Sequence, residues 1–332
     1  MKAVVATRFG ASDVLEYCEV DKPEPKSGEL LVRVKATAVG FGDTLIRIGA
    51  YRGGPDSHSY SLPAVLGFQA SGIVEGVGNG VSNNWLGRRV VANAAHTNAE
   101  YLVCSEGSAV EMPDSVDFDV ATLIPNFYLT AYHLLHTAVT ARAGQTAVVW
   151  AAAGGVGTAL VQLAKHVGLK VIAMAGSAEK CAFARAQGAD HVIEYGHEQV
   201  SQRVLDLTGG AGVDLVFNPV AGDTINDDVR MLVPHGKAVI YGLIQGLPKP
   251  DAVQTLLFEV MAKSLSISMF SLWTVMEHEP ERIRQSLREL LKLLEAGKIA
   301  PQIYAKLPLS DLAKGHDLLE SRKVMGNVVI EP

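Results

Sequence analysis

The sequence predicts an α/β protein with a doubly wound parallel sheet formed by the middle of the chain and a second, mostly β domain formed by its ends. Three observations support this fold class. A turn of small residues at 151–157 joins a strand-like run to a helix-like run. Strand-like and helix-like runs then alternate to about residue 270, which is typical of a parallel sheet with helices on both faces. The first 120 residues instead carry short strand patterns set among Gly, Asn and Ser.

The two ends of the chain are expected to fold together. Residues 30–36 (LLVRVKA) alternate like a half-buried strand. Other elements expected in these parts are short strands at 73–78 and 89–92, a helix at 280–296 and a final strand at 327–330. Because the final strand is expected to return to the N-terminal part, we assign 1–123 and 271–332 to one domain and 124–270 to the other, a division that suits a chain of 332 residues.

The turn at 151–157 has the composition of a loop that holds a diphosphate. Val148-Val149-Trp150 suits a strand buried on both faces, and 158–167 has the apolar spacing of a helix. Between them, Ala152, Gly154 and Gly157 occupy the glycine positions of G-x-G-x-x-G, which serve a tight turn, close approach to a pyrophosphate, and helix-to-strand packing. The expected cofactor contacts are Ala152, Gly154, Gly155, Val156 and Gly157. A turn that merely packs the helix on the strand is the alternative.

The end of the next strand indicates which dinucleotide would bind. After the apolar run 170–175, an NAD site would place Asp or Glu to bond the ribose 2′-OH. This chain has Gly176 and Ser177 there, followed by Lys180. Gly176 leaves room for a 2′-phosphate, Ser177 offers it a hydroxyl and Lys180 offers it a cation. NADP(H) is therefore favoured over NAD(H). The alternative for Lys180 is an ordinary solvated lysine on a helix.

More strand-like runs follow at the spacing of alternating β and α elements. They lie at 191–195, 213–217 and 237–241, separated by Gly-rich turns such as 208–212. This alternation extends the parallel sheet and places residues 124–270 in a doubly wound dinucleotide-binding (Rossmann) domain.

Composition and charge exclude several functional classes. The formal net charge of −6, without a basic run, argues against nucleic-acid binding. No signal peptide is expected, because the first residues hold no long apolar stretch, and no membrane span is expected, because no window is sufficiently apolar. Cys18, Cys104 and Cys181 are few, distant and odd in number, which suits a reduced cytoplasm better than a disulfide scaffold.

Several motifs, in order, resemble one known family. Ala36 to Asp43 followed by Arg47-x-Gly49-x-Tyr51 looks like A-x-x-V-N-x-x-D…R-x-G-x-Y. Pro63-x-x-x-Gly67 with Gly72 to Gly78, Thr130-Ala131-Tyr132 and 151–157 continue the match. The chain is similar over nearly its whole length to the zinc-free medium-chain dehydrogenase/reductases, in particular their NADPH:quinone oxidoreductase (zeta-crystallin-like) branch.

The resemblance implies roles for particular residues. It implies a GroES-like fold for the mostly β domain, a homodimer formed through the strand at 264–270, and substrate binding in the cleft between the domains. Tyr51 would be the proton donor or an orienting hydroxyl, and Thr130 would touch the nicotinamide amide or the substrate; packing of Tyr51 at the cleft mouth is the alternative. The expected contacts at the adenosine and 2′-phosphate end are Gly176, Ser177, Lys180 and Tyr195, and Gly242 is a further cofactor contact.

The same comparison predicts the absence of a metal. Where zinc-dependent relatives carry a cysteine near position 40 and a Gly-His-Glu segment, this chain has 40–43 (GFGD) and 67–69 (GFQ). Phe68 cannot ligate a metal, and a catalytic zinc needs about three ligands. Two departures concern the substrate side: Gly40 replaces the branch's asparagine, and the loop at 96–98 differs.

These features predict an NADPH-dependent oxidoreductase that transfers hydride to a quinone without a metal. A reductase of α,β-unsaturated carbonyls, such as an enone or enoyl thioester, is the alternative, because it would use the same site with a different pocket. A third possibility is an NADPH-binding sensor without catalysis. The expected partner is thus a small-molecule electrophile, a quinone or a conjugated carbonyl.

Overall fold

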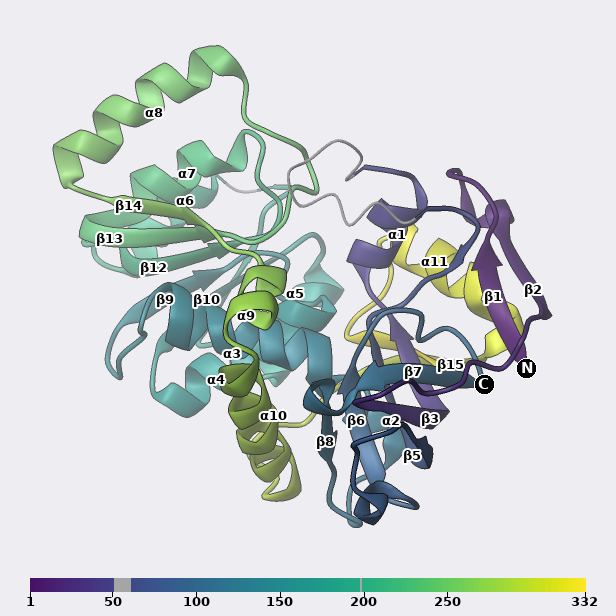
Figure 1. The fold of residues 1–332 in the computed structure, drawn as a ribbon. Coiled ribbons are helices and arrows are strands. Elements are labelled where there is room, and N and C mark those ends of the chain that lie inside the picture. The colour runs from purple at the N-terminus through teal and green to yellow at the C-terminus, as the bar shows by residue number, and fades with distance from the viewer. Residues whose placement is uncertain (51–60, 198) are drawn as a thin grey trace. The chain divides into compact units, whose positions relative to one another are not determined.

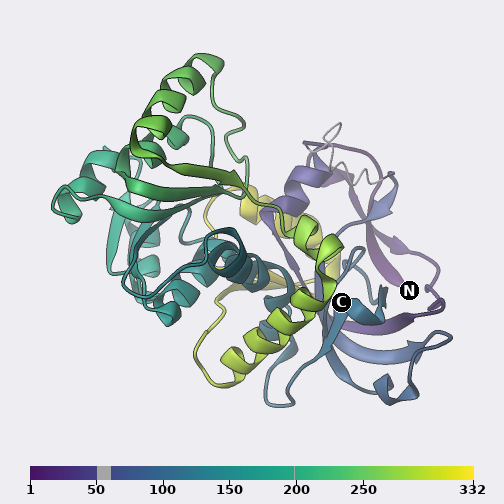
Figure 2. The ribbon, with the colours of Figure 1, turned by 60° about the vertical axis from the view of Figure 1, so that its left-hand side comes forward.

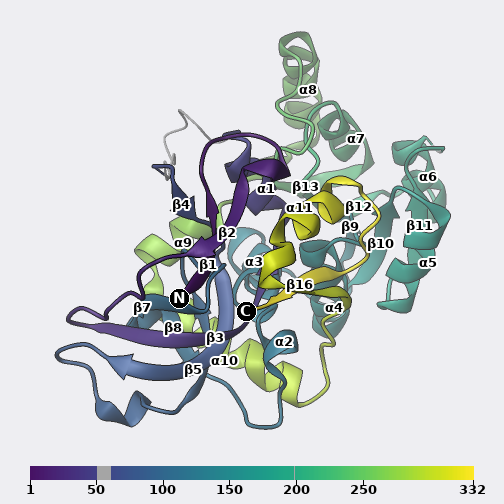
Figure 3. The ribbon, with the colours of Figure 1, turned by 90° about the vertical axis from the view of Figure 1, so that its right-hand side faces the viewer.

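The computed structural model of the protein describes residues 1–50, 61–197 and 199–332. The chain divides into two compact units, one of residues 1–129 with 279–332 and one of residues 130–278. Both ends of the chain belong to the first unit, where the N and C labels lie near each other in three views (Figures 1, 2 and 3).

The second unit is built on a six-stranded parallel sheet. Its strand order is β11-β10-β9-β12-β13-β14, so consecutive strands run outward in two directions from the centre, between β9 and β12. The strands are β9 (Thr146–Val149), β10 (Lys170–Ala175), β11 (His191–Glu194), β12 (Val213–Asn218), β13 (Leu232–Ile240) and β14 (Ser266–Met269). This centre is where a doubly wound sheet opens a crevice at the carboxyl ends of its strands.

Helices lie on both faces of this sheet (Figures 1 and 3). They are α4 (Gly155–Val167), α5 (Ala178–Ala186), α6 (Val200–Leu207), α7 (Thr224–Met231) and α8 (Pro250–Lys263). The short helices α3 (Leu129–His133) and α9 (Leu272–His278) lie near the start and the end of this unit. Helices α6 and α7 place Val204 and Met231 in a buried cluster with Val148 and Trp150. The apolar strands are covered from both sides, as their sequence predicts. The α/β, doubly wound fold class is confirmed.

The first unit is mostly β, as predicted. A seven-stranded sheet has the order β15-β16-β3-β5-β6-β8, with β7 also paired to β3, and a smaller sheet has the order β2-β1-β4. The strands are β1 (Lys2–Ala6), β2 (Leu15–Glu19), β3 (Glu29–Val39), β4 (Ala64–Val65), β5 (Gln69–Val77), β6 (Arg89–Asn93), β7 (Tyr101–Ser105), β8 (Ala109–Glu111), β15 (Ile303–Pro308) and β16 (Asn327–Glu331). The helices are α1 (Phe41–Arg47), α2 (Phe118–Ala121), α10 (Pro280–Glu295) and α11 (Leu312–Glu320).

The last strand of the chain closes this sheet. β16 pairs antiparallel with β3, with Val328 opposite Val39 and Ile330 opposite Thr37. Val328 and Ile330 are buried in a cluster with Val39 and Leu312 of α11. The C-terminal residues therefore complete a sheet that the N-terminal residues begin (Figure 3).

Some element boundaries differ from the expectation. The helix expected at 158–167 begins at Gly155, because the residues of the glycine-rich turn are themselves helical. The strand expected at 237–241 begins at Leu232, and Pro234 and Gly236 hide its pattern in the sequence. Within the described residues, no helix is both long enough and apolar enough to cross a membrane.

Candidate cofactor-binding site

The turn after β9 leads directly into the start of α4. Gly154 is the N-cap of α4 and has extended backbone angles, φ −81° and ψ 175°. The first N–H groups of any α-helix have no partner inside the helix, and a glycine cap supplies no side chain to bond them. The N–H groups of Gly155, Val156 and Gly157 are thus placed to bond an anion such as a diphosphate.

The glycines of this turn serve different purposes. A Cβ on Gly157 would lie 2.3 Å from the carbonyl oxygen of Ala151, so only glycine allows α4 to approach the turn this closely. A Cβ on Gly154 would lie 3.4 Å from the same oxygen, which is an ordinary contact. Gly157 is therefore required by packing, whereas Gly154 leaves room beside the backbone.

Ala152 departs from the fingerprint without distorting the turn. The left-handed conformation lies one residue earlier, at Ala151, whose φ is +50°. Ala152 is fully buried, and its N–H donates to the carbonyl oxygen of Met174 in β10, 2.9 Å away. The methyl group of Ala152 is accommodated because the tight turn does not need a glycine at that position.

The turn after β10 gathers the residues that were expected to hold a 2′-phosphate. Ser177 is the N-cap of α5, and its Oγ accepts the N–H of Lys180 at 3.3 Å. Lys180 lies in the first turn of α5, at the positive end of the helix dipole, where an anion is stabilised and a cation alone is not. The capping role of Ser177 was not predicted from the sequence, although Ser before a helix is a common cap.

Tyr195 comes from the neighbouring strand to the same place. It follows β11, and its N–H donates to the carbonyl oxygen of Ala175. A Cβ on Gly176 would lie 2.9 Å from the Tyr195 hydroxyl oxygen, so the phenol covers Gly176. Gly176, Ser177, Lys180 and Tyr195 are thus brought together at the carboxyl ends of β10 and β11.

The other expected site residues have separate positions. Gly242, just after β13, is pressed against Pro219: a Cβ there would lie 2.8 Å from the Pro219 carbonyl oxygen. Thr130 is the second residue of α3 and is half-buried. Tyr51 lies outside the described residues.

A buried polar network, which sequence reasoning missed, lies where β9 and β12 end. Trp150 Nε1 donates to Asp228 Oδ1 at 2.7 Å, and Asn218 Nδ2 donates to Asp228 Oδ2 at 2.6 Å. Asp228 is fully buried, and burial raises the pKa of its carboxyl from 3.8 to about 7, although the bonds from Asn218 and Trp150 act to lower it. The sequence pattern could have shown only that Asp228 lies on the inner side of a helix. It does not identify the residues that bond to it.

Gly40, which replaces the family's asparagine, is enclosed in the first unit. A Cβ on Gly40 would lie 3.2 Å from the Phe127 ring and 3.2 Å from Asp43 Oδ2. Asp43 Oδ2 accepts the Gly40 N–H at 2.7 Å, and burial raises the pKa of Asp43 to about 7. Arg47 pairs with Glu320 of α11. The ring of Phe127 therefore occupies space that a side chain at position 40 would need.

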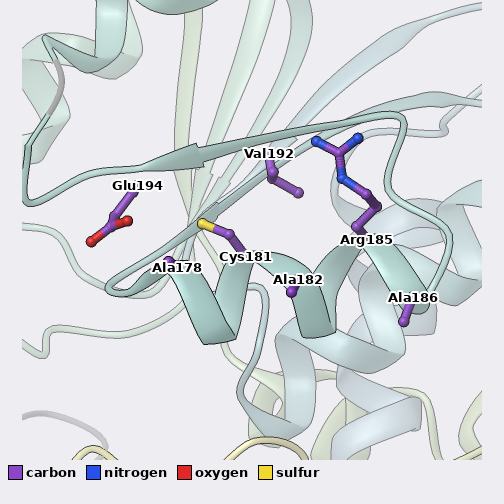
Figure 4. A pocket seen from close by; sticks show the side chains of 7 residues that line it. All are labelled: Ala178, Cys181, Ala182, Arg185, Ala186, Val192 and Glu194. Atoms are coloured by element: carbon purple, nitrogen blue, oxygen red, sulfur yellow. The ribbon is translucent and has the colours of Figure 1, made fainter.

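A groove beside α5 is distinct from these residues. Ala178, Cys181, Ala182, Arg185 and Ala186 of α5 and Val192 and Glu194 of β11 line it (Figure 4). Ala178 and Glu194 in its lining directly adjoin Ser177 and Tyr195 in the sequence, but none of the expected cofactor contacts lines it. The groove therefore borders the candidate site and is not itself that site.

The residues at the positions where zinc-dependent relatives bind their metal are not metal ligands in this chain. Phe68 and Gln69 stand at the segment where zinc-dependent relatives carry ligands, and Gly40 has no side chain. Among the described residues, no three His, Cys, Asp or Glu side chains are grouped so that they could hold a metal ion.

Comparisons with known proteins agree with the geometry. Residues 26–120 match the family model of the alcohol dehydrogenase GroES-like domain, and residues 155–295 match that of zinc-binding dehydrogenase. A quinone oxidoreductase of Pseudomonas aeruginosa is 33% identical over 333 residues, covering 100% of this chain and 99% of that protein. A 2-haloacrylate reductase of Burkholderia sp is 31% identical, covering 99% and 98%. The solved structure of Escherichia coli quinone oxidoreductase complexed with NADPH has a TM-score of 0.91 and 30% identity, with both chains fully covered.

Proposed function

We propose a function from one established premise: the chain belongs to the quinone oxidoreductase branch of the medium-chain dehydrogenase/reductases. The proposal is an NADPH-dependent oxidoreductase that reduces a quinone without a metal. The observation that carries it is the group formed by Ser177, Lys180 and Tyr195 around the start of α5, without a carboxylate at the end of β10.

NADP(H) is the cofactor, and residues 124–270 are its binding domain. The N–H groups at the start of α4 bind the diphosphate, and the close approach at Gly157 keeps that helix against its strand. Lys180 and the Ser177 hydroxyl contact the 2′-phosphate, and Tyr195 covers the adenosine end. Gly242 keeps the loop after β13 tight against Pro219 at the other side of the crevice.

Bound NADPH supplies a hydride, and the chain supplies position and protons. Tyr51 is the proposed proton donor or orienting hydroxyl, and Thr130 is the proposed contact to the nicotinamide amide or the substrate. A quinone and a conjugated carbonyl accept hydride without a Lewis acid, whereas a saturated carbonyl usually relies on one. Because Phe68 and Gly40 offer no metal ligand, we favour the conjugated acceptors.

Reduction of an α,β-unsaturated carbonyl is the second candidate. The similarity to a 2-haloacrylate reductase at 31% identity favours it, because that protein is named for an acceptor with a conjugated double bond. Both reactions would use the same cofactor site, so they differ in how the pocket holds the acceptor.

The test is oxidation of NADPH, with NADH as the control, against a benzoquinone, a naphthoquinone, a conjugated enone, a 2-haloacrylate and a saturated aldehyde. The proposal predicts turnover with the quinones. Turnover of the enone or haloacrylate alone would support the second candidate. Activity on the aldehyde would contradict the metal-free assignment, and binding of NADPH without any turnover would support a sensor.

We propose further that the protein is a homodimer assembled through the second unit. β14 is the outermost strand of its sheet, and Met269 at its end is 66% exposed. The neighbouring α8 exposes Leu257, Phe258 and Met261. Apolar side chains beside an open sheet edge are typical of an interface. Light scattering should give a particle mass of twice the chain mass for the wild type and a lower mass for Met261→Glu. A monomeric wild type would contradict the proposal.

A further inference from the structure

The Trp150–Asp228–Asn218 network joins the two loops at the centre of the sheet. Trp150 directly follows β9 and precedes the turn at 151–154, and Asn218 ends β12. Both side chains donate to the same carboxylate, one to each oxygen, at 2.7 and 2.6 Å. Because β9 and β12 are the central strands of the doubly wound sheet, Asp228 links the ends of the two strands between which such a sheet opens its crevice.

Asn218 also bonds to the backbone of the loop after β12. Its Oδ1 accepts the N–H groups of Val220 and Ala221 at 2.7 and 3.1 Å, and its Nδ2 also donates to Thr224 Oγ1. Ala221 has a left-handed φ of +58°, a conformation that a non-glycine residue adopts only when its surroundings hold it. The orientation of Asn218, and hence of this loop, depends on Asp228.

Trp150 extends the restraint in the other direction. Its indole lies against the Tyr195 ring, with centroids 5.8 Å apart and planes at 39°. Tyr195 in turn covers Gly176. A continuous series of contacts therefore runs along the carboxyl edge of the sheet, from the turn after β10 to the loop after β12.

We propose that Asp228 is a positioning residue for cofactor binding, which holds the loops after β9 and β12 in register only while its carboxyl group is ionised. The reason is the nature of its partners: the Trp150 indole and the Asn218 amide nitrogen can only donate hydrogen bonds. A protonated carboxyl carries an O–H that neither partner can accept, and its hydroxyl oxygen is a weaker acceptor than a carboxylate oxygen, so one of the two bonds would be weakened. This inference rests on the proposed function, because it assumes that these loops contact the dinucleotide.

Burial of the Asp228 carboxyl moves this change toward neutral pH. Burial raises its pKa to about 7, and the adjacent Asp227 on α7 contributes in the same direction. The groups that face it from the loop after β9 and from β12, Trp150 and Asn218, are neutral, and both lower its pKa. Beyond Trp150 lies the Tyr195 phenol. The balance lets the carboxyl exchange its proton within the physiological range.

The experiment compares the dissociation constant of NADPH between pH 6 and pH 8 in the wild type, in Asp228→Asn and in the matched control Asp227→Asn. An amide at 228 offers one acceptor in place of two, so we expect Asp228→Asn to bind about tenfold more weakly at pH 8. The difference from the wild type should shrink toward pH 6. The 2′-phosphate of NADPH titrates in all three proteins and cancels in this comparison. Asp227→Asn should bind like the wild type at pH 8.

A second variant keeps the inference testable if Asp228→Asn does not fold. Trp150→Phe preserves an aromatic ring beside Tyr195 but removes one hydrogen bond that favours the ionised carboxyl. We expect it to move the midpoint of the affinity profile to higher pH. A purely structural role would lower stability without moving that midpoint, so an unmoved midpoint would overturn the proposal.

A readout without cofactor separates this inference from the proposed function. The chain has three tryptophans, so Trp85→Phe with Trp273→Phe leaves Trp150 as the sole indole. Its fluorescence should show a transition near pH 7 that Asp228→Asn abolishes. If the transition is present and NADPH does not bind, the proposed function fails; if NADPH binds and the transition is missing, the role of Asp228 fails. Equal NADPH affinities of the wild type and Asp228→Asn at both pH values would also overturn it.

Discussion

The phenol of Tyr195 lies over Gly176 so closely that a Cβ at position 176 would fall 2.9 Å from its hydroxyl oxygen. The two residues come from different strand ends, and each limits what the other can be. Tyr195 is 40% exposed, so the residue that covers the glycine remains partly open to solvent. This contact sets the shape of the surface beside Ser177, where we place the 2′-phosphate.

Gly176→Ala should therefore displace Tyr195 and weaken NADPH binding. We expect an affinity loss of about 1 kcal/mol or more, because the methyl group forces the ring out of its place. Gly196→Ala is the matched control, since Gly196 follows Tyr195 directly and its Cβ would meet no atom within 4 Å. Isothermal titration of both variants with NADPH checks the prediction, and equal affinities would contradict it.

The glycines of the turn after β9 should separate folding from binding. Gly157→Ala brings a methyl group into the backbone of Ala151 and should lower the free energy of unfolding by about 1–3 kcal/mol. Gly154→Ala adds only an ordinary contact, so its free energy of unfolding should stay within about 1 kcal/mol of the wild-type value. Because the diphosphate needs close approach to the backbone, Gly154→Ala should nevertheless lose NADPH affinity.

Urea unfolding and NADPH titration of the two variants test this pair. A Gly154→Ala protein that binds NADPH as tightly as the wild type would mean that the turn only packs the helix on the strand. That alternative was open from the sequence, and this variant decides it.

Gly40→Asn, which introduces the asparagine typical of this branch, should destabilise this protein. The new side chain would collide with the Phe127 ring, at an expected cost of about 1–3 kcal/mol. Gly42→Asn on the same helix is the control, because a Cβ there meets no atom within 4 Å. Adding Phe127→Leu to Gly40→Asn should recover part of the loss, as a double-mutant cycle of thermal unfolding would show. Additive effects would argue against direct contact.

Asp43→Asn should change the pH dependence of stability. The pKa of Asp43 is raised in the folded protein to about 7, so the folded state holds its proton more tightly than the unfolded chain does. The wild type therefore loses stability from this group as pH rises from about 4 to about 7. The side-chain amide of Asp43→Asn does not titrate, so the variant does not lose stability in this way. Its free energy of unfolding relative to the wild type should therefore rise between pH 5 and pH 8. Urea unfolding at both values measures it, and a constant difference would refute the prediction.

The sequence predicted the architecture because its signals are local. Short apolar runs alternate with helical spacing from β9 to β14, and the glycine-rich turn lies between a strand and a helix, so periodicity and turn chemistry sufficed. The return of the final strand to the N-terminal part was also expected, but its two partners, β3 and β15, were not predicted.

The contacts that shape the candidate site could not be predicted in this way. Trp150 and Asp228 are 78 residues apart, and no spacing rule connects an indole with a carboxylate at that distance. In the turn after β9 the left-handed residue is Ala151, not the position that the glycine pattern indicates. An alanine in the sequence does not reveal that its backbone is left-handed. Likewise, the enclosure of Gly40 depends on Phe127, which lies in a π-helical turn at 124–128.

The most direct test of the central claim is the ratio of kcat/KM for NADPH to that for NADH, measured with a benzoquinone in the wild type and in Lys180→Ala. Lys180 and Arg185 lie on the same helix, so Arg185→Ala serves as the control. We expect a clear preference for NADPH that Lys180→Ala reduces by about 1.5–3 kcal/mol, the range for a charge-assisted hydrogen bond, while activity with NADH stays nearly unchanged. Equal use of both cofactors by the wild type, or equal loss with both in the variant, would contradict the assignment of this site to the 2′-phosphate of NADPH.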